Sequence, residues 1–153
     1  MKLLTLVAPG GEQARNTVSG ALAEWTRGLD IRLRFLNIGV DEAVVVLTGE
    51  ALAEAEAAIA RERPAAVLLH GRGPDALAAA ISVSKAGVPL VRTGAGRRDG
   101  EFSDGERAAD RLGTALLAEA AADLAALAAE GLAGEPFSPG AAVKAVIRIN
   151  REA

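Results

Sequence analysis

The feature that most constrains this chain is a regular alternation of short apolar runs with longer segments of helical periodicity. Turns rich in glycine and proline separate the two kinds of segment, as they do in βαβ units. Strands connected by such crossovers lie parallel, are buried by helices on both faces, and cross over in a right-handed sense. The apolar runs cover residues 2–8, 31–36, 65–70 and 88–93.

These patterns predict an α/β fold, and the length of 153 residues suits one domain. We expect a single Rossmann-like domain with a mostly parallel, doubly wound sheet and helices on both faces. Boundary residues support the helices, since Asp41 is an expected N-cap, Pro74 begins a helix and Gly87 closes it. The predicted helices cover residues 12–27, 41–62, 74–86, 106–112, 118–130 and 141–153, with a short strand at 114–117 and loops at 94–106 and 131–140.

The composition narrows the classes of function that are open to the chain. The net charge is −3 and the pI is near 5.3, so charge gives no support to a nucleic-acid partner. The chain has no cysteine and one histidine, which makes a metal site unexpected and fits a cytoplasmic protein. We expect no cofactor. We also expect no membrane partner, because no apolar stretch approaches the roughly 20 residues of a membrane span. Residues 2–8 are expected to be a buried strand rather than a signal peptide.

Candidate functional residues follow the predicted strands, whose carboxyl ends meet at one edge of the sheet, where such folds bind ligands. His70 ends a strand and is either a ligand contact and proton donor or, as we favour, a structural residue. Gly10 and Gly11 precede a helix and could offer backbone N–H groups to a phosphate. Their turn has neither the P-loop lysine nor the GxGxxG spacing, so an ordinary turn is the simpler interpretation.

Arginines and glycines dominate the same edge. The arginines either form an anion site for a phosphate or nucleotide, helped by the N-terminus of the helix after Gly73, or they line a solvated rim and pair with nearby acids. The arginines are Arg72, Arg92, Arg97 and Arg98, the glycines are Gly71, Gly73 and Gly94, and the nearby acids are Asp99, Glu101, Asp104 and Glu106. Trp25 and Phe35 are expected in the core or in an apolar contact patch, and Ser82 has no base in reach.

One long stretch resembles a known family. "RPAAVLLHGRGPDALAAAISVSKAGVPLVRTGAGRRDGE", residues 63–101, resembles the amino-terminal domain of the UDP-N-acetylglucosamine 2-epimerase family, with its LVHGD, TLAAA, G-IPV and HVEAGLRSGD blocks. "MKLLTLVAPGGE" is similar to the opening strand and GTRPE turn of that family. Residues 104–132 are similar to its PEE-NR-LTDHLAD segment and the following helix. The resemblance covers most of residues 1–131.

The resemblance implies a GT-B architecture, in which two Rossmann-like domains face a cleft and a last helix crosses back to the first domain. The end of this chain, "EPFSPGAAVKAVIRINREA", resembles the closing stretch of the family. We therefore expect residues 1–131 to form the epimerase-like amino-terminal domain and residues 139–153 to pack back on it, with the second domain missing. Val143, Val146 and Ile147 give the last helix its apolar stripe.

The family chemistry implied by the resemblance eliminates UDP to leave a glycal and adds it back after inversion at the sugar C2. It needs carboxylates as acid and base. Arg72 stands where the family has the aspartate after HG, and Gly94 stands where it has the glutamate before AG. Glu106 lies opposite the first glutamate of the PEE segment. We therefore expect an epimerase-like protein without epimerase activity by itself, acting as a binding or interaction subunit.

The sequence leaves two alternatives open. A small sugar-nucleotide isomerase or hydrolase would use the arginine-rich anion site, with Glu106 or His70 as its acid–base group. A flavodoxin-like regulatory domain would need an acidic cluster that the strand ends lack. The expected ligand is a UDP-sugar or phosphate. The expected partner is a second copy, because the family dimerises through its first domain, or a full-length GT-B protein.

Overall fold

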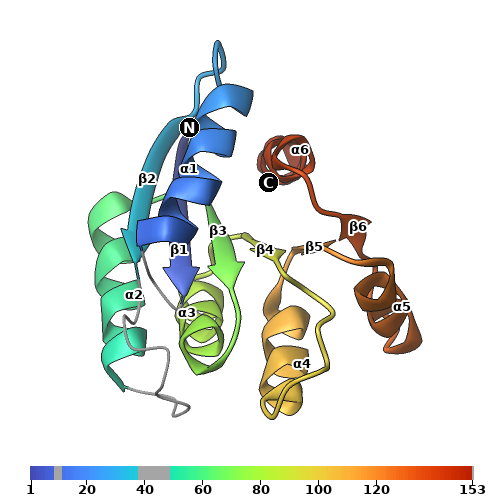
Figure 1. The fold of residues 1–153 in the computed structure, drawn as a ribbon. Helices are drawn as coiled ribbons and strands as arrows, with labels where there is room; N and C mark the ends of the chain where they lie inside the picture. The colour runs from blue at the N-terminus through green and yellow to red at the C-terminus, as the bar shows by residue number, and fades with distance from the viewer. Residues whose placement is uncertain (9–11, 38–48, 153) are drawn as a thin grey trace.

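The computed structural model describes residues 1–8, 12–37 and 49–152, in which strands and helices alternate (Figure 1). All paired strands are parallel, and the sheet has the order β2-β1-β3-β4-β5-β6. The expected α/β fold with a parallel sheet is confirmed. The elements are β1 (Lys2–Ala8), α1 (Glu12–Trp25), β2 (Arg32–Asn37), α2 (Gly49–Glu62), β3 (Ala66–Gly71), α3 (Pro74–Lys85), β4 (Leu90–Thr93), α4 (Ser103–Leu112), β5 (Ala115–Ala118), α5 (Ala121–Ala129), β6 (Glu135–Pro136) and α6 (Pro139–Glu152).

The pleat of the sheet divides the core into two layers, because successive side chains of a strand point to opposite faces. On one face, Leu4 and Leu69 pack with buried residues of α2, α3 and α4. On the other face, Leu3 and Leu68 pack with α1 and α6. A smaller cluster joins α5 to β5 through Leu127 and its neighbours. Every strand-end residue is therefore assigned to one face or the other by its position in the strand.

Small side chains let the helices of the first layer approach one another closely. The buried residues of α2 include Ala51, Ala55 and Ala58, and α3 packs against α2 with a similarly alanine-rich surface. Ser82 on α3 donates a hydrogen bond from its hydroxyl to the backbone oxygen of Leu52 at 3.0 Å. Ser82 is thus part of the helix–helix contact.

Helix α6 packs on α1 and the sheet with an apolar stripe. Val143 and Val146 are buried and Ile147 is half-buried. In Figure 1, α6 is viewed nearly along its axis while α1 runs in the plane of the picture, so the two helices cross steeply. Trp25 is 53% exposed but lies over the start of α6, since a Cβ on Gly140 would come within 2.9 Å of the indole. Trp25 therefore belongs to a surface contact and not to the core.

The observed boundaries differ from the expected ones at a few places. Helix α2 begins at Gly49 within the described residues, and Asp41, the expected N-cap, lies outside them together with the Phe35 side chain. Helix α4 begins at Ser103, three residues before the predicted start. The segment 131–140, expected to be a loop, contains β6, which pairs with Leu117 and Ala118. A two-residue edge strand leaves no periodic signal, and its proline needs no ladder donor at an edge.

None of the described helices is both long enough and apolar enough to cross a lipid bilayer.

Candidate functional site

Two hollows lie at the carboxyl edge of the sheet, and the pleat places them in different layers. We call the first the arginine cleft. Its volume is about 410 Å³ and its lining residues are Arg72, Gly73, Pro74, Arg97, Asp99, Gly100, Glu101, Phe102 and Glu106. We call the second the histidine pocket. Its volume is about 320 Å³ and its lining residues are Val18, Ala21, Leu22, Leu68, His70, Glu119, Phe137 and Pro139. The two sets share no residue.

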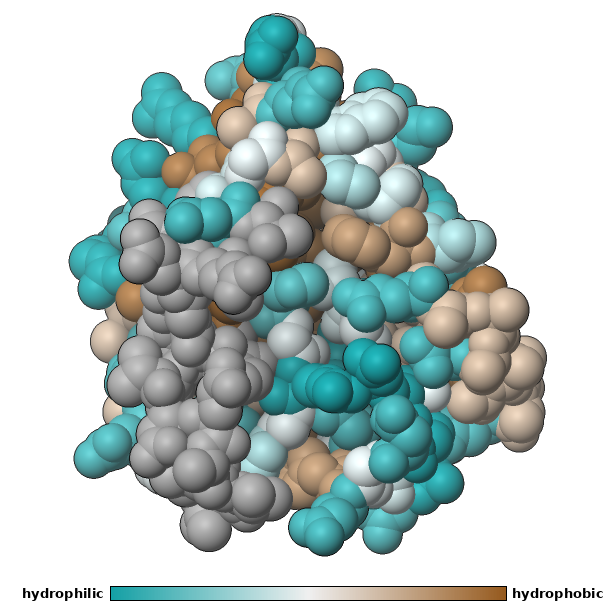
Figure 2. Space-filling view, in the orientation of Figure 1, coloured by the Kyte–Doolittle hydropathy of each residue, from teal (hydrophilic) through white to brown (hydrophobic). Residues whose placement is uncertain are grey.

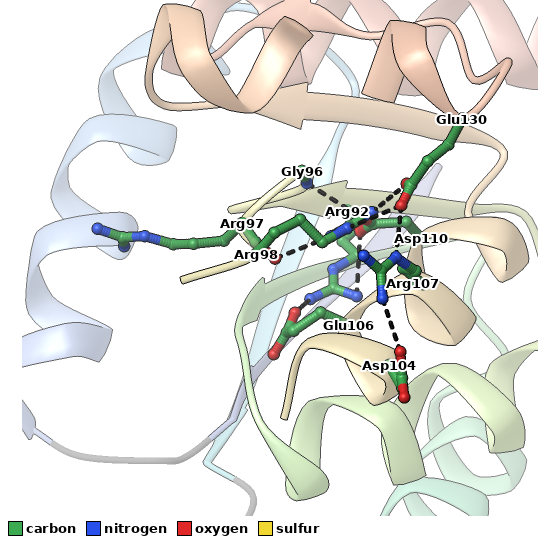
Figure 3. A network of polar contacts seen from close by, with 9 residues as sticks. All are labelled: Arg92, Gly96, Arg97, Arg98, Asp104, Glu106, Arg107, Asp110 and Glu130. Carbon is green, nitrogen blue, oxygen red and sulfur yellow. Dashed lines mark hydrogen bonds and ion pairs between the residues drawn. The ribbon is translucent and has the colours of Figure 1, made fainter. Parts of the chain in front are cut away.

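Arg92 forms the centre of a buried ionic network beneath the arginine cleft (Figure 3). Its side chain is fully buried in β4 and forms ion pairs with Glu106 and with Asp110, the latter at 3.2 Å. Both acids lie on α4, four residues apart, so they project from the same face of that helix. Burying a guanidinium without countercharges would strongly destabilise the fold. The two α4 carboxylates supply these countercharges.

The network continues from Asp110 towards α5. The Asp110 carboxylate accepts hydrogen bonds from Arg98 at 2.9 Å and from the backbone N–H of Gly96 at 3.0 Å. Glu130, just after α5, accepts from Arg98 at 2.6 Å and from Arg107 at 2.7 Å. The Arg98 and Arg107 hydrogen bonds lower the pKa of Glu130 to about 2. The loop after β4 is thereby held between α4 and α5.

Glu106 also occupies the N-terminus of α3. Its Oε1 accepts a hydrogen bond from the backbone N–H of Gly73 at 2.5 Å, while its Oε2 pairs with Arg92. Gly73 is the N-cap of α3, and the positive end of a helix favours an anion at that position. The carboxylate of the chain itself therefore sits where an external phosphate would otherwise bind, and both of its oxygens have partners.

The remaining two arginines of the edge face solvent. The side chains of Arg72 and Arg97 are 53% and 39% exposed, and both approach Asp99, at 3.9 and 3.7 Å. Neither distance is that of a close hydrogen-bonded pair. The four arginines that the sequence placed together thus divide, since Arg92 and Arg98 lie in the network and only Arg72 and Arg97 line the cleft.

The predicted glycines of the edge have a backbone reason to be glycine. Gly71, Gly73 and Gly94 all have positive φ, at 135°, 88° and 69°. Side chains with a Cβ rarely adopt such conformations, so these residues are explained by the turns themselves. Gly10 and Gly11, the other predicted phosphate contacts, lie outside the described residues.

His70 lies in the other layer, away from the arginines. Its Nδ1 is 2.8 Å from the hydroxyl of Thr93 on the neighbouring strand. Burial lowers the pKa of His70, and the charge of Glu119 opposes that shift in part. No group of three or more histidine, cysteine or acidic side chains that could hold a metal occurs in the described part of the chain.

Sequence reasoning missed Asp110 and Glu130. A signal for Asp110 was present, because Glu106 and Asp110 are four residues apart in a predicted helix and therefore share a face. Glu130 gave no such signal. Its contact with Arg98 spans 32 residues and depends on how α5 returns to the sheet.

The parallel sheet, its helices on both faces and its ligand-sized hollows at the carboxyl edge define a Rossmann-like α/β domain. Solved structures show which known fold it shares. This chain has the fold of half of a UDP-N-acetylglucosamine 2-epimerase. The UDP-GlcNAc 2-epimerase of Methanocaldococcus jannaschii superposes with a TM-score of 0.71 and 17% identity, covering 100% of this chain and 50% of that one.

Two further solved structures have a similar fold. The UDP-GlcNAc 2-epimerase of Neisseria meningitidis, solved bound to UDP-GlcNAc, has a TM-score of 0.75 at 14% identity and covers 99% of this chain and 49% of its own. MurG of Acinetobacter baumannii is more distant, with a TM-score of 0.56, 10% identity and coverage of 78% and 41%. This chain therefore spans about half the length of the structures it matches. No protein-family model and no curated protein matches the sequence.

Proposed function

We propose that this protein is a UDP-N-acetylglucosamine 2-epimerase-like binding or interaction subunit that does not catalyse epimerisation by itself. The proposal rests on the contacts that the Glu106 carboxylate makes. Of the carboxylates that the resemblance assigns to catalysis, only this one has a counterpart here, and it is bonded to Gly73 and Arg92. A general base needs an oxygen that can reach the substrate proton, and Glu106 has both oxygens engaged.

The ligand that we propose is a UDP-sugar, held at the arginine cleft through its diphosphate. Arg72 and Arg97 face the cleft with Asp99 as their shared and distant partner, so their N–H donors can turn to a phosphate. The epimerases of M. jannaschii and N. meningitidis were solved with UDP-GlcNAc, and the former also with UDP, which supports this class of ligand.

The test combines turnover and binding on one preparation of protein. UDP-GlcNAc is incubated with the chain and the sugar is followed by NMR for conversion to its C2 epimer. Binding of UDP, UDP-GlcNAc and inorganic phosphate is measured by calorimetry. We expect no epimer, saturable binding of UDP-GlcNAc, and a roughly tenfold loss of affinity, about 1.4 kcal/mol, when Arg72 and Arg97 are both changed to Gln.

A matched control is Arg148→Gln, which removes a half-exposed arginine of α6 remote from the cleft. Affinity should not change in that variant. Formation of the epimer by the isolated chain would contradict the loss of catalysis. Absence of binding by all three compounds would contradict the proposal that a UDP-sugar is the ligand, and would leave a protein as the proposed partner.

Self-association is the interaction we propose first, with a full-length GT-B protein as the alternative partner. Ile81 of α3 is 37% exposed, so this helix presents an apolar side chain to solvent. Light scattering at micromolar concentration should give the mass of a dimer, and Ile81→Glu should shift it to the monomer. A monomer in the unmodified protein would contradict the homodimer.

The competing proposal is a small sugar-nucleotide isomerase or hydrolase. It receives support from the exposed Arg72 and Arg97, but His70 lies in the other hollow, and Glu106 is bonded on both oxygens. Turnover of a UDP- or dTDP-sugar that disappears in His70→Ala or Glu106→Gln, while the melting temperature shows that the variant is folded, would favour this enzyme over the binding subunit.

A further inference from the structure

The histidine pocket has walls that are fixed by the fold. Leu68 of β3 and Leu22 of α1 contribute buried apolar surface. Phe137 is held by a hydrogen bond from its backbone N–H to the oxygen of Ala118 at 2.8 Å, directly beside Glu119. Ser138 then caps α6, accepting from the N–H of Ala141 at 3.0 Å. The pocket is therefore largely formed before any ligand arrives, as small-molecule sites usually are.

The imidazole of His70 presents an acceptor to this pocket. Nδ1 of His70 lies 2.8 Å from the hydroxyl of Thr93, and that hydroxyl can accept a hydrogen bond from Nδ1–H. In the tautomer with the proton on Nδ1, Nε2 keeps a lone pair for another partner, and a ligand that donates an N–H favours this tautomer. Because burial lowers the pKa of His70, the ring is neutral near pH 7.

The charge of the lining residues selects against anions. Glu119 brings a carboxylate to the rim, Phe137 brings an aromatic ring, and the pocket lining contains no lysine or arginine among the described residues. A carboxylate, a neutral nitrogen acceptor and an aromatic face all attract a cation that carries N–H donors. The apolar walls favour a ligand with a hydrophobic body.

We infer that the histidine pocket binds a small organic ammonium ion, with its charged nitrogen between Glu119 and Nε2 of His70 and its apolar body against Leu68 and Phe137. The inference does not rest on the function proposed above, because the arginine cleft lies in the other layer and attracts the opposite charge. A chain with both hollows would carry an anion site and a cation site on two faces of one sheet.

The test uses benzylammonium as the probe, with benzyl alcohol and benzoate as its neutral and anionic counterparts. Dissociation constants are measured by calorimetry at pH 7.5, and the site is located by amide shifts in NMR. We expect benzylammonium to bind at least tenfold more tightly than benzyl alcohol, and benzoate not to bind. The shifts should gather at His70, Glu119 and Phe137 and leave Arg72 and Arg97 unmoved.

Two variants and a control separate the charge from the cavity. Glu119→Gln keeps the shape of an exposed side chain and should bring benzylammonium to the affinity of benzyl alcohol. Ala21→Phe places a large side chain from α1 in the pocket and should abolish binding of both benzylammonium and benzyl alcohol. Glu101→Gln removes another exposed carboxylate, at the arginine cleft, and should leave the affinity for benzylammonium unchanged.

Three results would overturn the inference. The first is the absence of saturable benzylammonium binding at millimolar concentration. The second is equal affinity for benzylammonium and benzyl alcohol. The third is amide shifts that gather at the arginine cleft. Because Glu119→Gln is an exposed, isosteric change, its result stands even if Ala21→Phe does not fold.

Discussion

The carboxylate of Glu106 accepts the backbone N–H of Gly73 at 2.5 Å, joining α4 to the N-cap of α3 across 33 residues. The same side chain pairs with Arg92 on β4, so one acid connects two helices and the central part of the sheet. Figure 2 shows hydrophilic side chains gathered around α4 on the face of the molecule that is drawn there. A residue that resembles a catalytic acid in sequence therefore has a structural role in this fold.

Glu106→Gln should destabilise the protein. Glutamine keeps the shape and the acceptor for Gly73, but it removes the charge that balances Arg92, which costs about 1–3 kcal/mol for a hydrogen-bonded buried group. Urea denaturation measures the loss, with Glu101→Gln as a control at an exposed carboxylate near the same cleft. Equal stability of the two variants would show that Glu106 does not support the fold.

Arg92→Met should be more damaging than the loss of an exposed arginine. The change leaves Glu106 and Asp110 buried without their shared countercharge, and breaking a buried ion pair from one side costs about 3–5 kcal/mol. Arg92→Lys should recover only part of the loss, since one ammonium cannot match a planar fork of donors. Arg148→Met, at an exposed pair with Glu135, should leave the midpoint of denaturation nearly unchanged.

Glu130 should make part of the stability of the protein depend on pH in the acidic range. Its pKa is about 2 in the folded chain against an ordinary value of 4.5, because it accepts hydrogen bonds from Arg98 and Arg107. A lowered folded-state pKa stabilises the protein above the unfolded pKa, and this contribution is lost as the pH falls from about 4.5 towards 2. The melting temperature of Glu130→Gln should therefore vary less over this range than that of the parent, whereas Glu101→Gln should follow the parent.

Gly96→Ala should destabilise the loop that follows β4. Gly96 has φ of +86°, and a Cβ there would lie 2.2 Å from the backbone oxygen of Asp123. The left-handed backbone costs roughly 1–2 kcal/mol for a residue with a Cβ, and the clash adds to it. Gly131→Ala is the matched control, since its φ is +76° but nothing lies within 4 Å. Equal losses of unfolding free energy would mean that α5 can move away from the loop.

The layers of the molecule were predictable because they depend on local patterns. Apolar runs of six or seven residues became β1, β3 and β4, and prolines and glycines ended or began the elements between them. The short strand expected at 114–117 is β5, displaced by one residue. These features need only neighbouring residues, so the sequence contains them.

The candidate site was predictable only in part. Arg72, Gly73, Arg97 and Glu106 were expected at one edge and do line one cleft. His70 was expected at the same edge and lies there, near the end of β3, but it lines the other hollow, in the opposite layer. The difference is set by register: Leu69 pairs with Arg92, so His70 lies level with Thr93 and shares its face of the sheet. Periodicity along one strand does not reveal which residue of the next strand will lie beside it.

By itself the sequence determined the alternation of strands and helices, the parallel sheet that follows from it, and the edge where polar groups collect. Only the tertiary structure decided which charges are buried together, because Arg92, Glu106 and Gly73 come from three separate elements. It also decided that the arginines would divide between a network and a cleft. Desolvation is the physical reason, since an arginine carried into the interior by its strand must be met by carboxylates from whichever helix packs above it.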